Sequence, residues 1–158
     1  MTAGSPLHAA AISRLEIHHN ALLKLCLQLE DVAEDITTGA TTAFAYQVRA
    51  KAIPSLLSEA HFLEETVLFP DFGHHAGSGF ATVVIERLKA EHRCDRLSAE
   101  ELATTLQAVS EGRCRLAADT VAYMIRGFLE SLRRHILSEN LMLEALLAAK
   151  SEKREVFG

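Results

Sequence analysis

The strongest constraint on the fold is a helical spacing of apolar residues that recurs in four long segments. These segments cover about residues 6–37, 42–69, 79–110 and 113–149. In each of them apolar residues recur at intervals of three and four, without the sustained alternation of a β-strand. Four such helices with short connections predict an all-α, antiparallel four-helix bundle of up-down-up-down topology. A chain of 158 residues suits one domain of this kind.

Glycines and a proline mark the expected ends of these helices. Gly39 and Gly112 indicate two turns, and the glycines within 73–79 indicate a loop. Pro70 is expected to end the second helix, because proline lacks the amide hydrogen that a helix interior needs. Ser98 begins a sequence that resembles a capping box, but an internal repeat in the histidine spacing favours an unbroken third helix.

Polar residues with metal-binding side chains interrupt the apolar seams. Each predicted helix carries one histidine at a seam position, and these are His19, His61, His92 and His135. Glu65 and Glu139 each follow a seam histidine by four residues, and residues i and i+4 share one helical face. All of these side chains are therefore expected to point into the core.

Several imidazoles and two carboxylates in one apolar core need a compensating charge. An unpaired buried ion costs several kcal/mol, so partners or a cation must neutralise the group. A single histidine or a single His-Glu pair is common outside metal sites, and the prediction depends on their joint occurrence in four helices. Imidazole together with carboxylate suits iron, manganese or zinc.

Nearby titratable residues are interpreted as surface groups. Glu64 could be the inward carboxylate in place of Glu65, but the second His-Glu pair has a serine at the equivalent position, so Glu64 is expected to be exposed. His18 lies off the seam, and His74 and His75 lie in the predicted loop. Whether any of these three histidines adds a ligand is left open.

The histidine spacing also indicates an internal repeat. The interval from His19 to His61 differs by one residue from the interval from His92 to His135. The letters HFLEE that begin at His61 resemble the letters HILSE that begin at His135. Two helix pairs related by an approximate two-fold axis would bring all the seam histidines and both glutamates to one central point.

Charge and cysteine content exclude several other classes of protein. With 16 Lys plus Arg against 21 Asp plus Glu, the net charge of −5 argues against nucleic acid and anionic membranes as partners. No apolar run reaches the length of a membrane span, and no signal peptide is visible. The three cysteines are widely spaced, which favours reduced thiols and a cytoplasmic location.

These motifs together resemble the hemerythrin family, specifically the bacterial hemerythrin-like HHE cation-binding domains. The resemblance covers about residues 7–147 and rests on EIHHNALLKLCLQLE around His19, HFLEETVLFPDF from His61, AEHRCDR around His92 and HILSEN from His135. It implies a bundle around two non-haem iron ions with an oxo or hydroxo bridge. Glu65 and Glu139 would bridge the ions and the four seam histidines would be terminal ligands, with manganese or zinc as alternative metals.

The sequence departs from the oxygen-carrying members of that family. Those proteins have a second histidine four residues after the one on the third helix, where this chain has Arg96. They also have an aspartate five residues after the histidine of the fourth helix, whereas here Glu139 stands at four. One histidine fewer leaves more coordination positions for water or a small ligand, so binding of or reaction with dioxygen, nitric oxide or peroxide is the leading expectation.

The sequence leaves three alternatives open. The domain could be a metal- or redox-responsive sensor, an iron-centre repair protein, or a helical interaction module without metal. A sensor without an attached output domain would act through a partner or a homo-oligomer. No nucleophilic residue has a convincing base partner, so enzymatic turnover is not assigned.

Overall fold

The computed structural model describes residues 7–77 and 79–156, and no strand occurs in these ranges. The long helices are α1 (Ala9–Asp35), α2 (Ala43–Leu63), α4 (Phe80–Ser110) and α5 (Ala118–Glu152). A π-helical turn, η1 (Glu64–Leu68), and a short helix, α3 (Phe69–His75), follow α2 directly. The predicted all-helical bundle is confirmed. None of the described helices has both the length and the apolar character needed to cross a bilayer.

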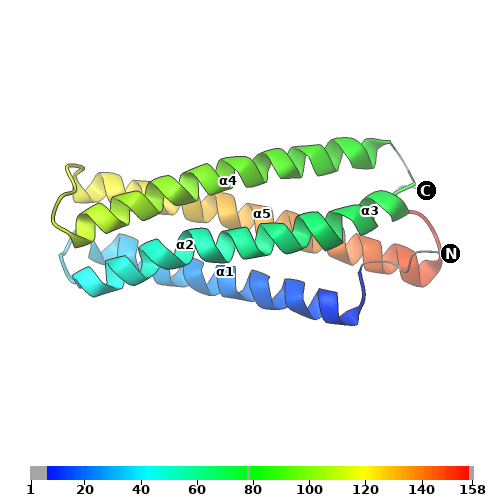
Figure 1. Cartoon of the computed structure of the whole chain (residues 1–158), viewed down its shortest axis with the longest axis horizontal. Helices are drawn as coiled ribbons and strands as arrows, with labels where there is room; N and C mark the ends of the chain where they lie inside the picture. The colour runs from blue at the N-terminus through cyan, green and yellow to red at the C-terminus, as the bar shows by residue number, and fades with distance from the viewer. Residues whose placement is uncertain (1–6, 78, 157–158) are drawn as a thin grey trace.

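The long helices lie alongside one another in an elongated bundle (Figure 1). In that view α1 and α4 run from right to left, and α2 and α5 run from left to right. Helix α1 packs against α2 and α5, and α4 packs against the same two helices. A side chain at an inward position halfway along any long helix therefore faces the same central space.

The turns and helix ends follow local sequence signals. Gly39 and Gly112 have φ angles of 72° and 66°, a region that favours glycine. The Thr42 hydroxyl caps α2 by accepting a hydrogen bond from the Ala45 amide. Helix α4 runs without a break through Ser98, as the repeat predicted. The predicted start of the first helix at residue 6 lies outside the described residues.

The prediction that Pro70 ends the second helix is wrong. The chain continues through Pro70 into α3, so Gly73, His74 and His75 are helical instead of forming a loop. In a regular α-helix the proline ring would clash with the carbonyl group four residues earlier. Directly before the proline the backbone is π-helical instead, since the Phe69 amide donates to the Glu64 carbonyl five residues back.

Helix α3 is attached to the C-terminal end of α5. Asp71 is buried, and its Oδ2 lies 2.5 Å from Nζ of Lys150. The Val156 amide donates a hydrogen bond to the His75 carbonyl at 3.0 Å. These contacts keep the segment after η1 against the bundle and so support the position of the π-helical turn.

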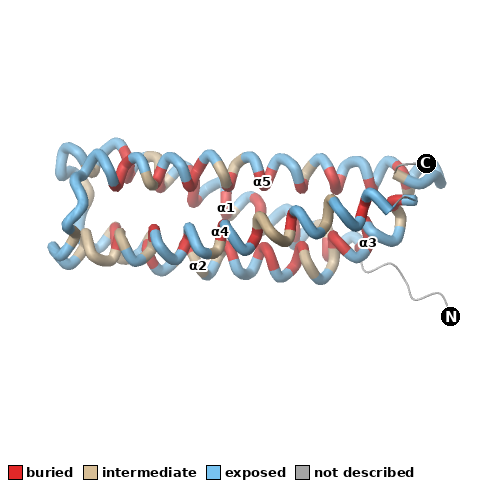
Figure 2. Tube along the Cα trace, turned by 90° about the horizontal axis from the view of Figure 1, so that it is seen from above, coloured by how far each residue is buried: buried red, intermediate tan, exposed pale blue. Residues whose placement is uncertain are grey.

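The buried apolar residues form two clusters, and Figure 2 shows that buried positions recur along the inner faces of the helices. The larger cluster contains Leu22, Leu57, Leu102 and Leu132, among others. The second cluster, nearer the chain ends, contains Leu15, Phe69, Leu88, Met142 and Leu146, among others. A layer of buried histidine and glutamate side chains lies between these clusters.

Candidate metal centre

The polar layer contains one residue each from α1, α2 and α4, two from α5 and one from the π-helical turn. Its members are almost fully buried: His19 (4% exposed), His61 (2%), Glu64 (1%), His92 (0%), His135 (5%) and Glu139 (0%). On α1, His19 is preceded and followed by the buried Leu15 and Leu22, at intervals of four and three. Ordinary helical periodicity therefore directs these polar groups inward together with their apolar neighbours.

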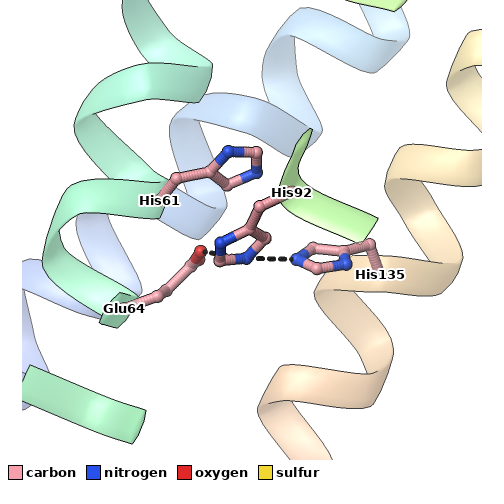
Figure 3. Close-up of side chains that lie close together, drawn as sticks. All are labelled: His61, Glu64, His92 and His135. Carbon is pink, nitrogen blue, oxygen red and sulfur yellow. Dashed lines mark hydrogen bonds and ion pairs between the residues drawn. The ribbon is translucent and has the colours of Figure 1, made fainter. Parts of the chain in front are cut away.

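One group of donor atoms comes from His61, Glu64, His92 and His135 (Figure 3). One ligand atom from each of these residues lies within 4.8 Å of the others. Nε2 of His92 lies 2.9 Å from Nε2 of His135 and 3.2 Å from Oε2 of Glu64. Nitrogen and oxygen donors at such short separations can be shared by a single cation.

A second group contains His19, Glu64 and Glu139. Nε2 of His19 lies 2.7 Å from Oε1 of Glu64 and 3.5 Å from Oε2 of Glu139. The donor atoms of this group also lie within 4.8 Å of one another. Glu64 is therefore a member of both groups.

Each buried carboxylate reaches histidines of both groups. Glu64 directs Oε1 to His19 and Oε2 to His92. Glu139 has Oε2 near His19, and its Oε1 lies 3.0 Å from Nε2 of both His92 and His135. Two oxygens of one carboxylate that face different sets of histidines form the arrangement needed to connect two neighbouring cations.

The expected exposure of Glu64 is wrong. Glu64 is buried and belongs to both donor groups, whereas the Glu65 side chain is 33% exposed and belongs to neither. Nδ1 of His92 instead donates a hydrogen bond of 2.7 Å to Oε1 of Glu65. Glu65 thus contacts the outer side of a histidine whose other ring nitrogen faces the centre.

The sequence contains a signal for Glu64 that the internal repeat obscured. Ile53, Leu57, Ala60, Glu64 and Leu68 follow intervals of three and four, and all are buried. Transferring the spacing of the second His-Glu pair to the first predicts Glu65 instead. That transfer fails because α2 changes into a π-helical turn at Glu64, while α5 stays α-helical through Glu139.

Three of the four histidines have oxygen atoms near Nδ1, the nitrogen on the outer side. His92 donates to Glu65, and Nδ1 of His19 donates to Oδ1 of Asn140 at 2.8 Å. Nδ1 of His135 lies 3.5 Å from Glu91 and 3.8 Å from Asp95. The hydrogen bonds at His19 and His92 orient those rings and leave Nε2 for a cation, whereas the buried Nδ1 of His135 has no hydrogen-bond partner. These partners lie on other elements of the bundle than the histidines they contact, so the sequence alone does not reveal them.

His61 differs, since its Nδ1 lies 3.4 Å from the Nη1 atom of Arg96. The His61 ring stacks on the His92 ring with a centroid distance of 3.7 Å and an interplanar angle of 9°. Nε2 of His61 is buried and has no hydrogen-bond partner. A bound cation would supply the missing partner of this buried nitrogen. The imidazole and carboxylate groups of the polar layer are ligands that iron, manganese and zinc accept.

The electrostatic environment raises the pKa of three buried histidines, His19, His92 and His135. At His135, burial opposes the charged form, but a hydrogen bond to Glu139 raises the pKa. Burial alone would lower the pKa of His19, but hydrogen bonds to Glu139 and Glu64 raise it to about 10. Burial likewise opposes the charged form of His92, but hydrogen bonds to Glu139 and Glu64 raise its pKa to about 10. In the cation-free protein these imidazolium groups therefore neutralise the buried carboxylates.

The remaining groups, His61, Glu64 and Glu139, differ in the direction of their pKa shifts because their neighbours differ. Burial and the adjacent positive charges of His92 and His135 lower the pKa of His61 to about 2. Burial and the charge of Glu139 raise the pKa of Glu64. Although burial alone would raise the pKa of Glu139, hydrogen bonds from its histidine neighbours hold it well below the usual range. A divalent cation would replace the histidine protons as the balancing charge.

The other histidines lie outside this centre. Of His18, His74 and His75, none belongs to either donor group found among residues 7–77 and 79–156. His75 instead hydrogen-bonds through Nδ1 to the Asp71 carbonyl at 2.9 Å.

The comparison with known families agrees with the geometry. The chain matches the description "Hemerythrin HHE cation binding domain" over residues 10–147, a range that includes every member of the polar layer. Neither a search of curated proteins nor a search of solved structures found a match. A match over most of the chain, together with buried histidine and glutamate donors from each long helix, shows that the chain belongs to the hemerythrin HHE cation-binding domain family.

Proposed function

We propose that this domain is a non-haem di-iron protein that binds or reacts with dioxygen, nitric oxide or a peroxide. One observation carries the proposal: each of the two buried carboxylates, Glu64 and Glu139, directs one oxygen to His19 and the other to the second set of histidines. One iron would be held by His61, His92 and His135, and the other by His19. Both carboxylates would connect the two ions.

The donor set by itself also accepts manganese or zinc. Iron is proposed because the chain belongs to the hemerythrin HHE family and its donors are limited to imidazole and carboxylate. Two six-coordinate ions require more donors than the polar layer supplies, so coordination positions remain for water and an external ligand. Bound iron would supply redox chemistry toward a small oxidant or nitric oxide.

The surrounding side chains would control access to the centre. Leu22, Leu57, Leu132 and Met142 are buried and belong to the two apolar clusters that enclose the polar layer. They exclude bulk water from the donors. A cavity of about 510 Å³ between α4 and α5 has His135, Asp95 and Ser131 in its lining and so reaches one member of the polar layer from outside.

The test is to purify the chain without oxygen and measure its metal content. We expect about two iron ions per chain and new near-ultraviolet absorption from an oxo-bridged ferric pair after exposure to air. Nitric oxide added to the ferrous protein should give a distinct visible spectrum. Less than one metal ion per chain, or a full complement of zinc with no iron binding after reconstitution, would contradict the proposal.

A further inference from the structure

Arg96 places a fixed positive charge at the edge of the polar layer. Its Nη1 lies 3.4 Å from Nδ1 of His61 and 3.6 Å from Oε1 of Glu65. The Arg96 side chain is 38% exposed, while His61 is buried. Arg96 therefore reaches inward from the surface of α4 to the outer nitrogen of a histidine on α2.

The polarity of this contact determines which nitrogen of His61 carries the proton. A guanidinium group only donates hydrogen bonds and keeps its charge in proteins. Nδ1 of His61 must then accept, so neutral His61 carries its hydrogen on Nε2. That nitrogen is the buried one without a hydrogen-bond partner. A cation needs a lone pair there, and the hydrogen blocks it.

The contrast with His92 shows what a favourable partner does. The Glu65 carboxylate accepts the Nδ1 hydrogen of His92 at 2.7 Å, which favours a lone pair on Nε2 once a cation displaces the second proton. Arg96 imposes the opposite arrangement on the neighbouring ring. In these two stacked rings, the partner of His92 favours a lone pair on Nε2, whereas the partner of His61 favours a hydrogen there.

We propose that Arg96 is a positioning residue that weakens cation binding at the His61 position by holding His61 in the tautomer with hydrogen on Nε2. This inference rests on the proposed di-metal function. Nη1 of Arg96 already forms an ion pair with Oε1 of Glu65 at 3.6 Å, so Arg96 keeps a partner when a cation displaces the Nε2 hydrogen of His61. Because this second partner is available, Arg96 lowers the affinity without preventing binding.

The first experiment measures the affinity for two divalent cations that keep their oxidation state when oxygen is excluded. Zn²⁺ and Co²⁺ are titrated into the cation-free chain in competition with a chromophoric chelator, and Co²⁺ spectra report the number of bound ions. In Arg96→Gln we expect the cation at the His61 position to bind about 10- to 100-fold more tightly, the usual range for a change behind a metal ligand. Arg93→Gln is the matched control, because Arg93 is exposed on the same helix. It should change the affinity by less than about threefold.

A double-mutant cycle separates the tautomer from simple charge repulsion. If Arg96 acts through His61, Arg96→Gln should have no further effect in a His61→Phe background. A gain that persists in that background overturns the inference. Circular dichroism and thermal unfolding of each cation-free variant establish that it is folded.

The tautomer itself can be observed without metal. Two-bond ¹H–¹⁵N spectra of the cation-free chain should show His61 with hydrogen on Nε2, and with hydrogen on Nδ1 in Arg96→Gln. A wild-type His61 with hydrogen on Nδ1 overturns the inference. Two bound cations with unchanged affinity in Arg96→Gln also overturn it while leaving the proposed function intact, whereas no cation binding by either chain overturns both.

Discussion

The two His-Glu segments of the chain, residues 61–65 and 135–139, have similar sequences and different structures. Each begins with a buried histidine and has a glutamate four residues later. Glu139 is fully buried among three histidines, while the Glu65 side chain is 33% exposed and forms ion pairs with the outer nitrogen of His92 and with Arg96. In the first segment Glu64, three residues after the histidine, has the inward role.

The difference arises from the backbone on the C-terminal side of each histidine. Helix α5 continues as a regular α-helix well beyond Glu139. Helix α2 becomes π-helical at Glu64, and the chain then passes through Pro70 into α3. A π-helical turn adds a residue to the helical turn and is frequent at functional sites. An equal spacing in sequence therefore does not guarantee an equal position around the helix axis.

The largest expected effect comes from exchanging Glu64 for an uncharged isostere. Glu64→Gln removes a charge that faces both donor groups, so we expect cation affinity to fall by more than about 100-fold, beyond the range typical of residues behind the ligands. The measurement is a Zn²⁺ titration in competition with a chromophoric chelator. Ser138→Ala is the matched control, because Ser138 is the exposed residue at the equivalent place in the second segment, and it should bind normally.

Glu65→Gln should have a smaller effect. Glu65 fixes the ring of His92 through one hydrogen bond, and the loss of such a partner lowers metal affinity by about 10- to 100-fold. The same titration should show an unchanged number of bound ions. A loss greater than that of Glu64→Gln would reverse the assigned roles of the two glutamates.

The pH dependence of the cation-free chain should separate His19 from His61. The raised pKa of His19, about 10, means that its stabilising contribution is complete below pH 6.5 and is lost as the pH rises toward 10. The lowered pKa of His61, about 2, has the opposite sign, so its contribution is complete above pH 6.5 and is lost as the pH falls toward 2.

Denaturant unfolding of the cation-free protein tests both signs. Between pH 6.5 and about 9.5 the unfolding free energy should decrease in the wild type and change less in His19→Gln. Between pH 6.5 and about 4 the His61→Phe variant should lose less stability than the wild type. Cation affinity should increase from pH 6.5 to about 9.5, because His19 and His92 must release protons to bind a metal. An affinity that is independent of pH in this range would contradict the assigned protonation states.

Pro70→Ala should have the smallest effect and tests the origin of the π-helical turn. Alanine supplies an amide hydrogen and removes the ring clash, so the turn is free to become a regular α-helix. We expect a change in cation affinity of less than about tenfold and a change in stability within about 1 kcal/mol. Pro54→Ala alters a proline within α2 and is the control, with unchanged cation affinity expected.

Much of the centre could be predicted from the sequence alone. The burial of His19, His61, His92, His135 and Glu139 is predictable because each replaces an apolar residue in a regular seam, and burial of one helix face follows from local periodicity. The same periodicity favours Glu64 on α2, whereas the analogy with the second segment favours Glu65.

Other features were decided by the tertiary structure. Arg96 of α4 meets His61 of α2, and His19 of α1 meets Asn140 of α5, only because these helices pack together. The sequence determined which residues face inward, because that property depends on the spacing within one helix. Only the tertiary structure decided which atoms meet, because hydrogen-bond partners on separate helices depend on the relative axial positions of those helices and, at Glu64, on the π-helical turn that follows α2.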